Sequence, residues 1–354
     1  MTRADRVCAR FAAKELDLLL VTNLVSIRYL SGFTGTNALV ILGPDTRRFL
    51  TDFRYVSQAT EQVTGFELER APQEFFEALR EGWPDGRLRV GFEDDHLTVR
   101  QLARLEGIVP GPVELVAAGG LVEAERALKE PGELAAIQAA SDLADDALRQ
   151  VLEDGLAGRT ERAVARALED EMRDRGAVPS FPTIVASGEH GALPHAVPRD
   201  VEIPIGVLVT IDWGARLGGY CSDCTRTFAT GETDGALGEI YDVVERAQGE
   251  ALAAVRPGPT GREVDEIARR IIEEAGHGEH FGHGLGHGVG MEVHEAPRLA
   301  KTGKEPLQPG HVVTVEPGVY VPGRGGVRIE DLVFVTESGH TVASGLPKHL
   351  TVVS

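Results

Sequence analysis

The chain has 354 residues, of which 26% are charged and 42% hydrophobic, and it carries a formal net charge of −19 at pH 7. This length is sufficient for two domains with separate cores. The acidic balance argues against a nucleic-acid partner, because phosphate contacts require a basic surface. We also expect no membrane association, because no apolar run approaches the roughly 18 residues of a membrane span.

The three cysteines, Cys8, Cys221 and Cys224, are typical of a reducing cytoplasm without a disulfide framework. The early apolar stretch at residues 16–21 is short and is not followed by a small-residue cleavage site, so we expect no secretory signal and a cytoplasmic protein. Cys221 and Cys224 form a C-x-x-C pair. We interpret them as strand residues flanking Asp223; a redox pair, which normally opens a helix, is the alternative.

The first 125 residues alternate strands and helices, which is typical of a mixed α/β domain. The predicted elements are a helix over Arg3–Glu15, a strand over Leu16–Thr22, a hairpin of Ala38–Leu42 and Arg48–Thr51, a helix over Gln73–Glu81, a strand over Leu88–Phe92 and a helix over Thr98–Leu105 capped by Thr98. A long helix is predicted next, from Glu133 to about Leu152. We place the boundary near residue 125, which gives an N-terminal domain over 1–125 and a C-terminal domain over 126–354.

The C-terminal domain contains a weak internal duplication. Residues 158–164 (GRTERAV) and 258–264 (GPTGREV) share the pattern G-x-T-x-R-x-V. Each copy opens a predicted helix with a threonine N-cap, and Glu263 completes a capping box with Thr260. Two such helix–strand units can pack as pseudo-symmetric halves with a site between them. The pattern is short, and a chance match is the alternative.

Four carboxylates and one imidazole in the last third of the chain each lie in a compact motif. They are Asp212 in VTIDWG, Asp223 in CSDCTRT, His287 in GHGLGHGVGMEVHE, Glu316 in TVEPGVY and Glu330 in VRIED. This set suits two divalent cations held side by side, since carboxylate oxygens favour Mn, Co or Zn and a bridging carboxylate contacts both ions. Two ions about 3.5–4 Å apart can share and activate a water. The pattern therefore predicts a hydrolase.

The first two carboxylates are predicted to lie on neighbouring strands. Val207–Trp213 is a predicted strand with Asp212 near its end, and Gly219–Phe228 is a second predicted strand that contains Asp223. If Leu217-Gly218 is the two-residue loop, the two carboxylates lie directly opposite each other. Like charges there destabilise a strand pair unless a cation lies between them. We therefore prefer a metal site to the alternative of two acids near an exposed turn.

Glu316 ends a predicted strand, and Glu330 lies within the β run Val327–Val335. Because successive strand residues face opposite ways, only one of Glu330 and Asp331 can face the site. Arg328 shares the face of Glu330 and suits a substrate anchor or a charge balance. The glycines around His287 argue against a helix. We interpret His277, His280 and His311 as structural or surface residues.

With these motifs the chain resembles the pita-bread metallopeptidases, and within them the proline-specific branch of prolidase (Xaa-Pro dipeptidase) and aminopeptidase P. The resemblance covers nearly the whole chain, including SIRYLSGFTG, FLTDFRY, LKEPGELAAIQAA and the five motifs above. It implies an α+β fold with a mixed α/β N-terminal domain and a pseudo-twofold pita-bread C-terminal domain. It also implies a homodimer in which the N-terminal domain serves dimerisation and limits the depth of the site.

The resemblance carries the site over residue by residue. The five motif residues fall on the ligands of two metal ions, with Asp223 and Glu330 touching both; Mn is the preferred metal, with Co or Zn as alternatives. His195 matches a histidine that contacts substrate, and His294 one that stabilises the tetrahedral intermediate. His283 and Arg328 match substrate-side residues that support the site. Where many relatives have asparagine after ASG, this chain has Glu189-His190, which leaves His195 in register.

The implied mechanism assigns two proton roles. Glu316 takes a proton from a metal-activated water and passes it to the leaving proline nitrogen. His294 donates to the developing oxyanion, or alternatively only packs beside the metals. Arg298 is the candidate partner for the carboxylate of a dipeptide, because its guanidinium binds carboxylates bidentately. A solvated loop arginine is the alternative.

These residues favour a prolidase that acts on short proline-containing dipeptides. Aminopeptidase P, acting on longer peptides, is the first alternative. A methionine aminopeptidase would share the five ligands but would not need the N-terminal domain. A non-catalytic peptide-binding protein would be expected to have lost ligands, and the sequence retains all five.

Overall fold

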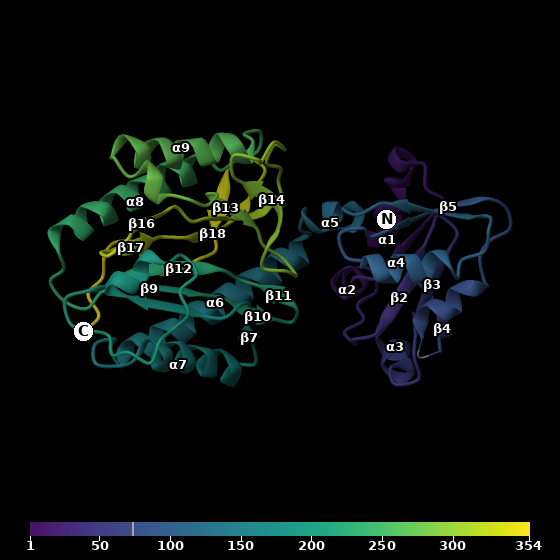
Figure 1. Cartoon of the computed structure of the whole chain (residues 1–354), viewed down its shortest axis with the longest axis horizontal. Helices are drawn as coiled ribbons and strands as arrows, with labels where there is room; N and C mark the ends of the chain where they lie inside the picture. Colours follow the sequence, from purple (N-terminus) through teal and green to yellow (C-terminus); the bar gives the residue numbers. More distant parts are fainter. Residues whose placement is uncertain (73) are drawn as a thin grey trace. The chain divides into compact units, whose positions relative to one another are not determined.

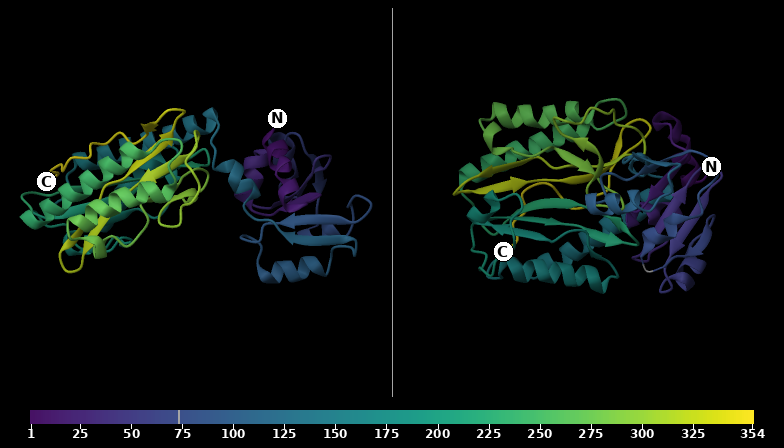
Figure 2. Two further views of the ribbon diagram at one scale, coloured as in Figure 1. Left: turned by 90° about the horizontal axis from the view of Figure 1, so that it is seen from above. Right: turned by 45° about the vertical axis from the view of Figure 1, so that its right-hand side comes forward.

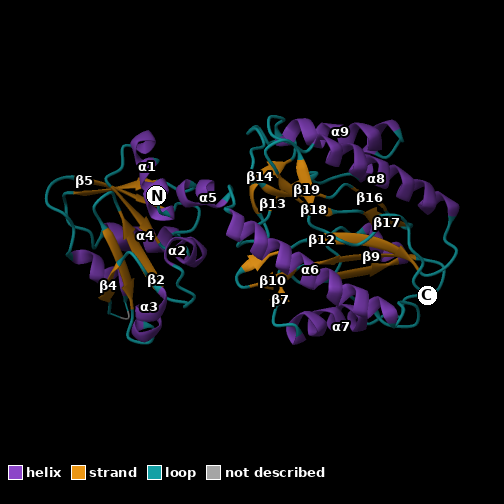
Figure 3. Cartoon of the chain, turned by 180° about the vertical axis from the view of Figure 1, so that it is seen from behind, coloured by secondary structure: helices purple, strands orange, loops and turns teal. Residues whose placement is uncertain are grey.

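The computed structural model describes residues 1–72 and 74–354, which form two compact units, Met1–Arg126 and Ala127–Ser354 (Figure 1). No helix in the described part of the chain is both long enough and apolar enough to cross a membrane. The predicted α+β class is confirmed, because both units combine helices with sheets whose strands are largely antiparallel or mixed. Figure 3 shows the distribution of helices and strands within each unit.

The first unit is built on one six-stranded mixed sheet with the order β4-β3-β2-β1-β5-β6. Its strands are β1 (Leu18–Val21), β2 (Ala38–Leu42), β3 (Arg47–Thr51), β4 (Glu67–Arg70), β5 (Leu88–Phe92) and β6 (Val113–Ala117). Its helices are α1 (Arg3–Ala9), α2 (Leu24–Ser31), α3 (Val56–Gln62), α4 (Val99–Glu106) and α5 (Leu121–Arg126), with short 3-10 turns η1 (Phe11–Lys14) and η2 (Phe75–Arg80). Apolar residues of β1, β2, β5 and β6 form much of its core.

Most predicted elements of this unit are confirmed, with two differences. The hairpin of β2 and β3 is present, and Thr98 caps α4 through a capping box. The helix predicted over Arg3–Glu15 is split, because α1 ends at Ala9 and Glu15 terminates the following 3-10 turn in a left-handed conformation. The predicted start of the next helix, Gln73, lies outside the described residues, and Phe75–Arg80 is a 3-10 turn.

The second unit pairs helices with two main sheets. Its helices are α6 (Pro131–Glu153), α7 (Glu161–Asp174), α8 (Gly235–Ala254) and α9 (Gly261–Glu274), with 3-10 turns η3 (Gly188–Ala192) and η4 (Gly278–His280). Its strands are β7 (Val178–Pro179), β8 (Ile184–Ser187), β9 (Leu208–Trp213), β10 (Ala215–Leu217), β11 (Tyr220–Cys221), β12 (Cys224–Ala229), β13 (Gly286–Gly288), β14 (Glu295–Leu299), β15 (Val312–Val315), β16 (Gly318–Val321), β17 (Gly325–Arg328), β18 (Asp331–Val335) and β19 (His340–Val342).

The helices of this unit cover the outer faces of the sheets (Figure 2). One main sheet has the order β12-β9-β8 and packs its apolar side chains against α6 and α7. The other has the order β14-β13-β15-β18-β19 and shares a core with α8 and α9. Because both sheets bury one face against helices, their remaining faces are available for polar groups between the two halves.

The two copies of G-x-T-x-R-x-V occupy equivalent places in these halves. They open α7 and α9, each of 14 residues, and Thr160 and Thr260 are the N-caps. The preceding glycines also make matching bonds: Gly158 N–H donates to Ile203 O at 2.9 Å and Gly258 N–H to Leu307 O at 3.0 Å. The local geometry therefore favours a true duplication over a chance match.

The predicted register around the first two carboxylates is wrong. Asp212 is paired with Thr225, not with Asp223, and the turn between β10 and β11 is Gly218-Gly219. Both glycines have positive φ angles, 59° and 97°, as a two-residue turn of the I′ type requires. Asp223 lies in the interruption between β11 and β12. Its carboxylate nevertheless lies close to that of Asp212, because Asp223 is two residues from Thr225 and therefore lies diagonally across from Asp212.

Candidate metal centre

The five predicted ligands all line one cavity of about 690 Å³. They come from separate elements: Asp212 from β9, Asp223 from the β11–β12 interruption, His287 from β13, Glu316 from the residue after β15 and Glu330 from the residue before β18. Carboxylate oxygens of Asp212, Asp223 and Glu330 lie within 4.8 Å of one another. His287 Nε2 lies 3.3 Å from Glu316 Oε1 and 3.6 Å from Asp223 Oδ2.

The donor set fits divalent cations. Four carboxylates and an imidazole supply hard oxygen and borderline nitrogen ligands. Burial, and then the neighbouring carboxylates, raise the pKa of Asp223 and of Glu330 well above the usual range of carboxyl groups. Asp212 Oδ1 is buried and has no hydrogen-bond partner among the described residues. Cations would compensate both the crowded charge and the unpaired oxygen.

Neighbouring groups orient these ligands. Thr225 Oγ1 donates to Glu330 Oε2 at 2.7 Å, and Thr314 Oγ1 donates to Glu316 Oε1 at 3.0 Å. His287 Nδ1 lies 3.1 Å from Gly288 O. If Nδ1 carries the proton that this contact favours, Nε2 is left as a metal ligand on the side of the carboxylates.

Arg328 faces the site, as the alternation along its strand predicts. Its Nη2 donates to Asp212 Oδ2 at 2.7 Å and its Nη1 to the Tyr320 hydroxyl at 2.8 Å. Tyr320 Oη also lies 3.0 Å from His283 Nε2, so Arg328, Tyr320 and His283 form one chain of hydrogen bonds. Tyr320 was not among the predicted site residues, although it ends the TVEPGVY motif that contains Glu316.

Three further predicted residues line the same cavity. They are His195, His294 and Arg298. The His294 ring contacts the His287 ring edge to face, with centroids 4.4 Å apart. Burial, and then the nearby His287, lower the pKa of His294. A neutral imidazole at this position retains one N–H that can donate to substrate.

The guanidinium of Arg298 makes no hydrogen bond or ion pair with another residue in the described part of the chain. Its strand position lies directly opposite His287. Arg328, by contrast, is already engaged by Asp212 and Tyr320. Of these two cavity arginines, Arg298 is therefore the one available to a charged substrate group.

The remaining histidines and cysteines lie outside the ligand cluster. His311 accepts the Gln308 N–H at 3.1 Å and is buried, and the rings of His277 and His280 contact each other. Cys221 ends β11 and Cys224 begins β12. Both are buried free thiols, in agreement with the interpretation as strand residues flanking Asp223.

The segment that carries His195 is held at both ends by one buried carboxylate. Glu161 Oε1 accepts the Ser187 N–H at 2.9 Å, and Oε2 accepts the Arg199 N–H at 3.0 Å. The Arg199 guanidinium and His190 Nδ1 also contact it. Burial opposes its ionisation, but the hydrogen bonds from Arg199 and Ser187 outweigh it and lower the pKa of Glu161 to about 2.

We expect Glu161→Gln to reduce the free energy of unfolding at pH 7 by about 1–3 kcal/mol, because buried donors lose a charged acceptor. The folded-state pKa is depressed, so this stabilisation is complete above the unfolded pKa of about 4.3 and disappears as the pH falls towards 2. Denaturant unfolding at pH 7 and pH 3 measures the difference. Glu169→Gln, which loses only a partly exposed ion pair with Arg173 on the same helix, is the matched control; equal effects of the two changes would contradict the assignment.

The chain belongs to metallopeptidase family M24, whose model matches residues 135–337; the Creatinase/Prolidase N-terminal domain model matches residues 3–128. The pita-bread family that the motifs resemble is therefore confirmed, and the chain is a metallopeptidase of a family that uses divalent metal ions.

Individual relatives cover nearly the whole chain. A solved Xaa-Pro dipeptidase from Bacillus anthracis is 40% identical, has a TM-score of 0.95 and is covered over 99% of each chain. The Xaa-Pro dipeptidase of Pyrococcus horikoshii is 36% identical over 330 residues, 92% of each chain. A solved X-Pro aminopeptidase from Thermotoga maritima is 34% identical, with a TM-score of 0.90 over 99% of this chain and 100% of the other.

Proposed function

We propose that this chain is a prolidase, which hydrolyses the Xaa-Pro bond of dipeptides with two divalent metal ions. The observation that carries the proposal is the convergence of four carboxylates and His287 on the wall of one cavity. Membership of the metallopeptidase family and the similarity to two Xaa-Pro dipeptidases support it. Mn is the proposed metal, with Co or Zn as alternatives, because carboxylate-rich sites accept all three.

Asp212, Asp223, His287, Glu316 and Glu330 would hold the ions. When bound, two such ions supply Lewis acidity and lower the pKa of water. Glu316 lies beside His287 and accepts the Thr314 hydroxyl at 3.0 Å, and we assign it the proton-accepting role. In its ionised form it can take a proton and deliver it to the proline nitrogen that leaves.

The histidines act on the substrate side. His294 lies against the His287 ring and lines the cavity, so its N–H can donate to the oxyanion that develops on the scissile carbonyl. His195 lines the same cavity on the segment that Glu161 holds, and we assign it a substrate contact. His283 supports Tyr320, which in turn contacts Arg328.

The preference for dipeptides rests on Arg298. A dipeptide places a carboxylate directly after proline, and an unengaged guanidinium in the cavity is its natural partner. An aminopeptidase acting on longer peptides is the second candidate, because the Thermotoga maritima relative carries that name and is nearly as similar. We further propose a cytoplasmic homodimer, which the free thiols suit and which solution sizing would test.

The experiment compares hydrolysis of Leu-Pro and Leu-Pro-Gly by chelator-stripped protein with and without added Mn. Metal-dependent cleavage of Leu-Pro alone is the expected result. A preference for Leu-Pro-Gly would make the chain an aminopeptidase. Cleavage of neither peptide would contradict the proposal.

Arg298→Ala should lower kcat/KM for Leu-Pro by about 10–100-fold, because a hydrogen bond to a charged group contributes about 1.5–3 kcal/mol. Steady-state kinetics measures the change. Arg324→Ala, which removes an exposed arginine beyond the end of β16, is the control and should leave kcat/KM unchanged. An unaltered rate in the Arg298 variant would leave the dipeptide preference without its proposed basis.

A further inference from the structure

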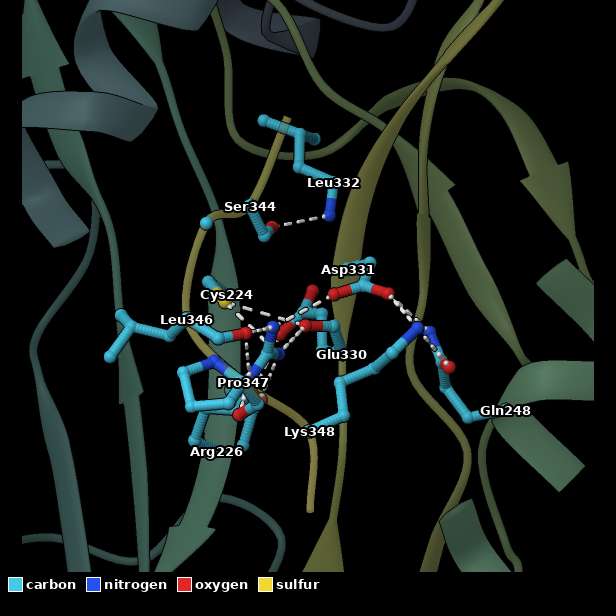
Figure 4. Close-up of polar contacts among 12 residues, drawn as sticks. Cys224, Arg226, Gln248, Glu330, Asp331, Leu332, Ser344, Leu346, Pro347 and Lys348 are labelled. Atoms are coloured by element: carbon cyan, nitrogen blue, oxygen red, sulfur yellow. Dashed lines mark hydrogen bonds and ion pairs between the residues drawn. The ribbon is translucent and has the colours of Figure 1, made fainter. Parts of the chain in front are cut away.

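A buried ion pair between Arg226 and Asp331 lies beside the proposed ligand Glu330 (Figure 4). Arg226 and Asp331 are each 1% exposed, and Arg226 Nη2 lies 2.9 Å from Asp331 Oδ1. Asp331 follows Glu330 in the chain, and the two side chains point to opposite sides. The carboxylate of Glu330 therefore faces the cavity, while that of Asp331 faces the ion pair.

The ion pair joins the two main sheets of this unit at the level of the ligands. Arg226 lies on β12, next to Thr225, which is paired with Asp212. Asp331 lies on β18, where it is paired with Val315, the residue before Glu316. The contact therefore connects the strand pair that carries Asp212 to the strand pair that carries Glu316 and Glu330.

Arg226 also holds the backbone on both sides of this junction. Its Nη1 donates to the carbonyl oxygen of Glu330 and, at 3.0 Å, to that of Thr225. Its Nη2 donates to Leu346 O at 2.7 Å and its Nε to Pro347 O at 3.0 Å. One guanidinium thus fixes the main chain of a metal ligand, of the residue beside it in the other sheet and of the C-terminal tail.

The second carboxylate oxygen of Asp331 contacts the same C-terminal segment, through Lys348. Asp331 Oδ2 accepts from Lys348 Nζ at 2.7 Å and from Gln248 Nε2 at 2.8 Å. Lys348 Nζ also donates to Gln248 Oε1 at 3.0 Å, which closes a small ring of polar contacts. Ser344, earlier in the tail, accepts the Leu332 N–H through its hydroxyl at 2.9 Å.

We propose that Arg226, Asp331 and the tail residues Leu346–Lys348 position Glu330 relative to Asp212 and Asp223, so that two metal ions bind as one coupled pair. The inference rests on the proposed two-metal function. A buried ion pair is weak evidence for a stability role, since apolar residues of similar volume often stabilise a fold as well. Groups behind metal ligands, however, commonly set affinity by fixing ligand orientation.

The test titrates Mn into chelator-stripped wild type and variants, and follows bound Mn and the electron paramagnetic resonance signal of an exchange-coupled Mn pair. Arg226→Gln, shown to be folded by circular dichroism and sizing, should bind the second Mn about 10–100-fold more weakly and lose the coupled signal. Lys348→Met, at the partly exposed edge of the network, should show a smaller loss in the same direction.

The matched control is Arg159→Gln. Arg159 also donates to two backbone carbonyls, Val151 O and Gly155 O. It is not among the residues that line the cavity, and it is not a partner of the Arg226–Asp331 ion pair. Its loss should leave Mn binding unchanged. Arg226→Lys keeps the charge but has fewer directed donors, so partial recovery of the coupled signal is expected.

Wild-type affinity and a wild-type coupled signal in folded Arg226→Gln would overturn the positioning role. Should that variant not fold, Lys348→Met decides: weakened binding of the second Mn supports the inference, and unaltered binding overturns it. Failure of wild type to bind two Mn ions would instead contradict the proposed function, so the two failures are distinguishable.

Discussion

Asp223→Asn is expected to lower kcat/KM for Leu-Pro by at least about 10³-fold, because metal ions contribute several kcal/mol of transition-state stabilisation. Asp223 lies at the centre of the cluster: its carboxylate is within 4.8 Å of those of Asp212 and Glu330 and 3.6 Å from His287 Nε2. An amide at this place cannot supply a charged oxygen to both ions. Bound Mn should therefore fall below two per chain, as counted by metal analysis after gel filtration.

Although Asp223→Asn should lower activity, it should raise the thermal stability of the metal-free protein. Without cations, the carboxylates of Asp212, Asp223 and Glu330 crowd one another, and replacing one with a neutral amide relieves this repulsion. We expect the metal-free variant to have a higher Tm than metal-free wild type. Asp170→Asn, on an exposed helix surface, is the control and should change neither activity nor Mn content. A fully active Asp223→Asn enzyme would show that this residue is not a ligand.

Glu316→Gln should reduce kcat for Leu-Pro by about 10²–10⁴-fold at saturating Mn, the usual contribution of general acid–base catalysis. The amide retains an oxygen that can ligate a metal and can still accept the Thr314 hydroxyl contact. It cannot take up and return a proton. The measurement is kcat with bound Mn determined in the same sample, so that lost metal and lost proton transfer are separated.

If the variant binds Mn as wild type does and turns over at the wild-type rate, Glu316 is not the proton acceptor. If it loses Mn and activity together, restoration of both by excess Mn would identify it as a ligand without a proton role. Thr314→Val is a useful companion, because it removes the hydroxyl that donates to Glu316 and accepts the His287 N–H but leaves both side chains in place, and it should have a much smaller effect.

Much of the fold and the members of the candidate site could be predicted from local patterns. Glycine punctuation, threonine caps and apolar runs identified the strands around Asp212 and Glu330 and the helices α7 and α9. That Glu330 and Asp331 face opposite sides of the sheet followed from strand geometry alone. These features depend on residues that are neighbours in the chain, which is why the sequence reveals them.

The register around Asp223 could not be obtained in the same way. A two-residue turn at Leu217-Gly218 and one at Gly218-Gly219 are both compatible with the letters RLGG, and they differ by one residue in each strand. The positive φ angles of both glycines select the second turn. A shift of this kind moves a side chain to a different partner, so the predicted direct pairing of the two aspartates failed.

The residues that hold the site in place could not be predicted from the sequence, for a different reason. Tyr320 meets His283 across 37 residues, Arg226 meets Asp331 across 105, and Glu161 meets Arg199 across 38. No local pattern distinguishes such charged or aromatic residues from ordinary surface residues. Only the packing of the two sheets against each other and their helices brings these partners together.

The most direct test of the central claim is the rate of Leu-Pro hydrolysis as Mn is returned to chelator-stripped protein, with bound Mn counted in the same samples. The five-residue site predicts no hydrolysis without metal and a rate that reaches its plateau at two Mn per chain. A full rate in the stripped protein, a plateau at one Mn, or no cleavage with two Mn bound would contradict it.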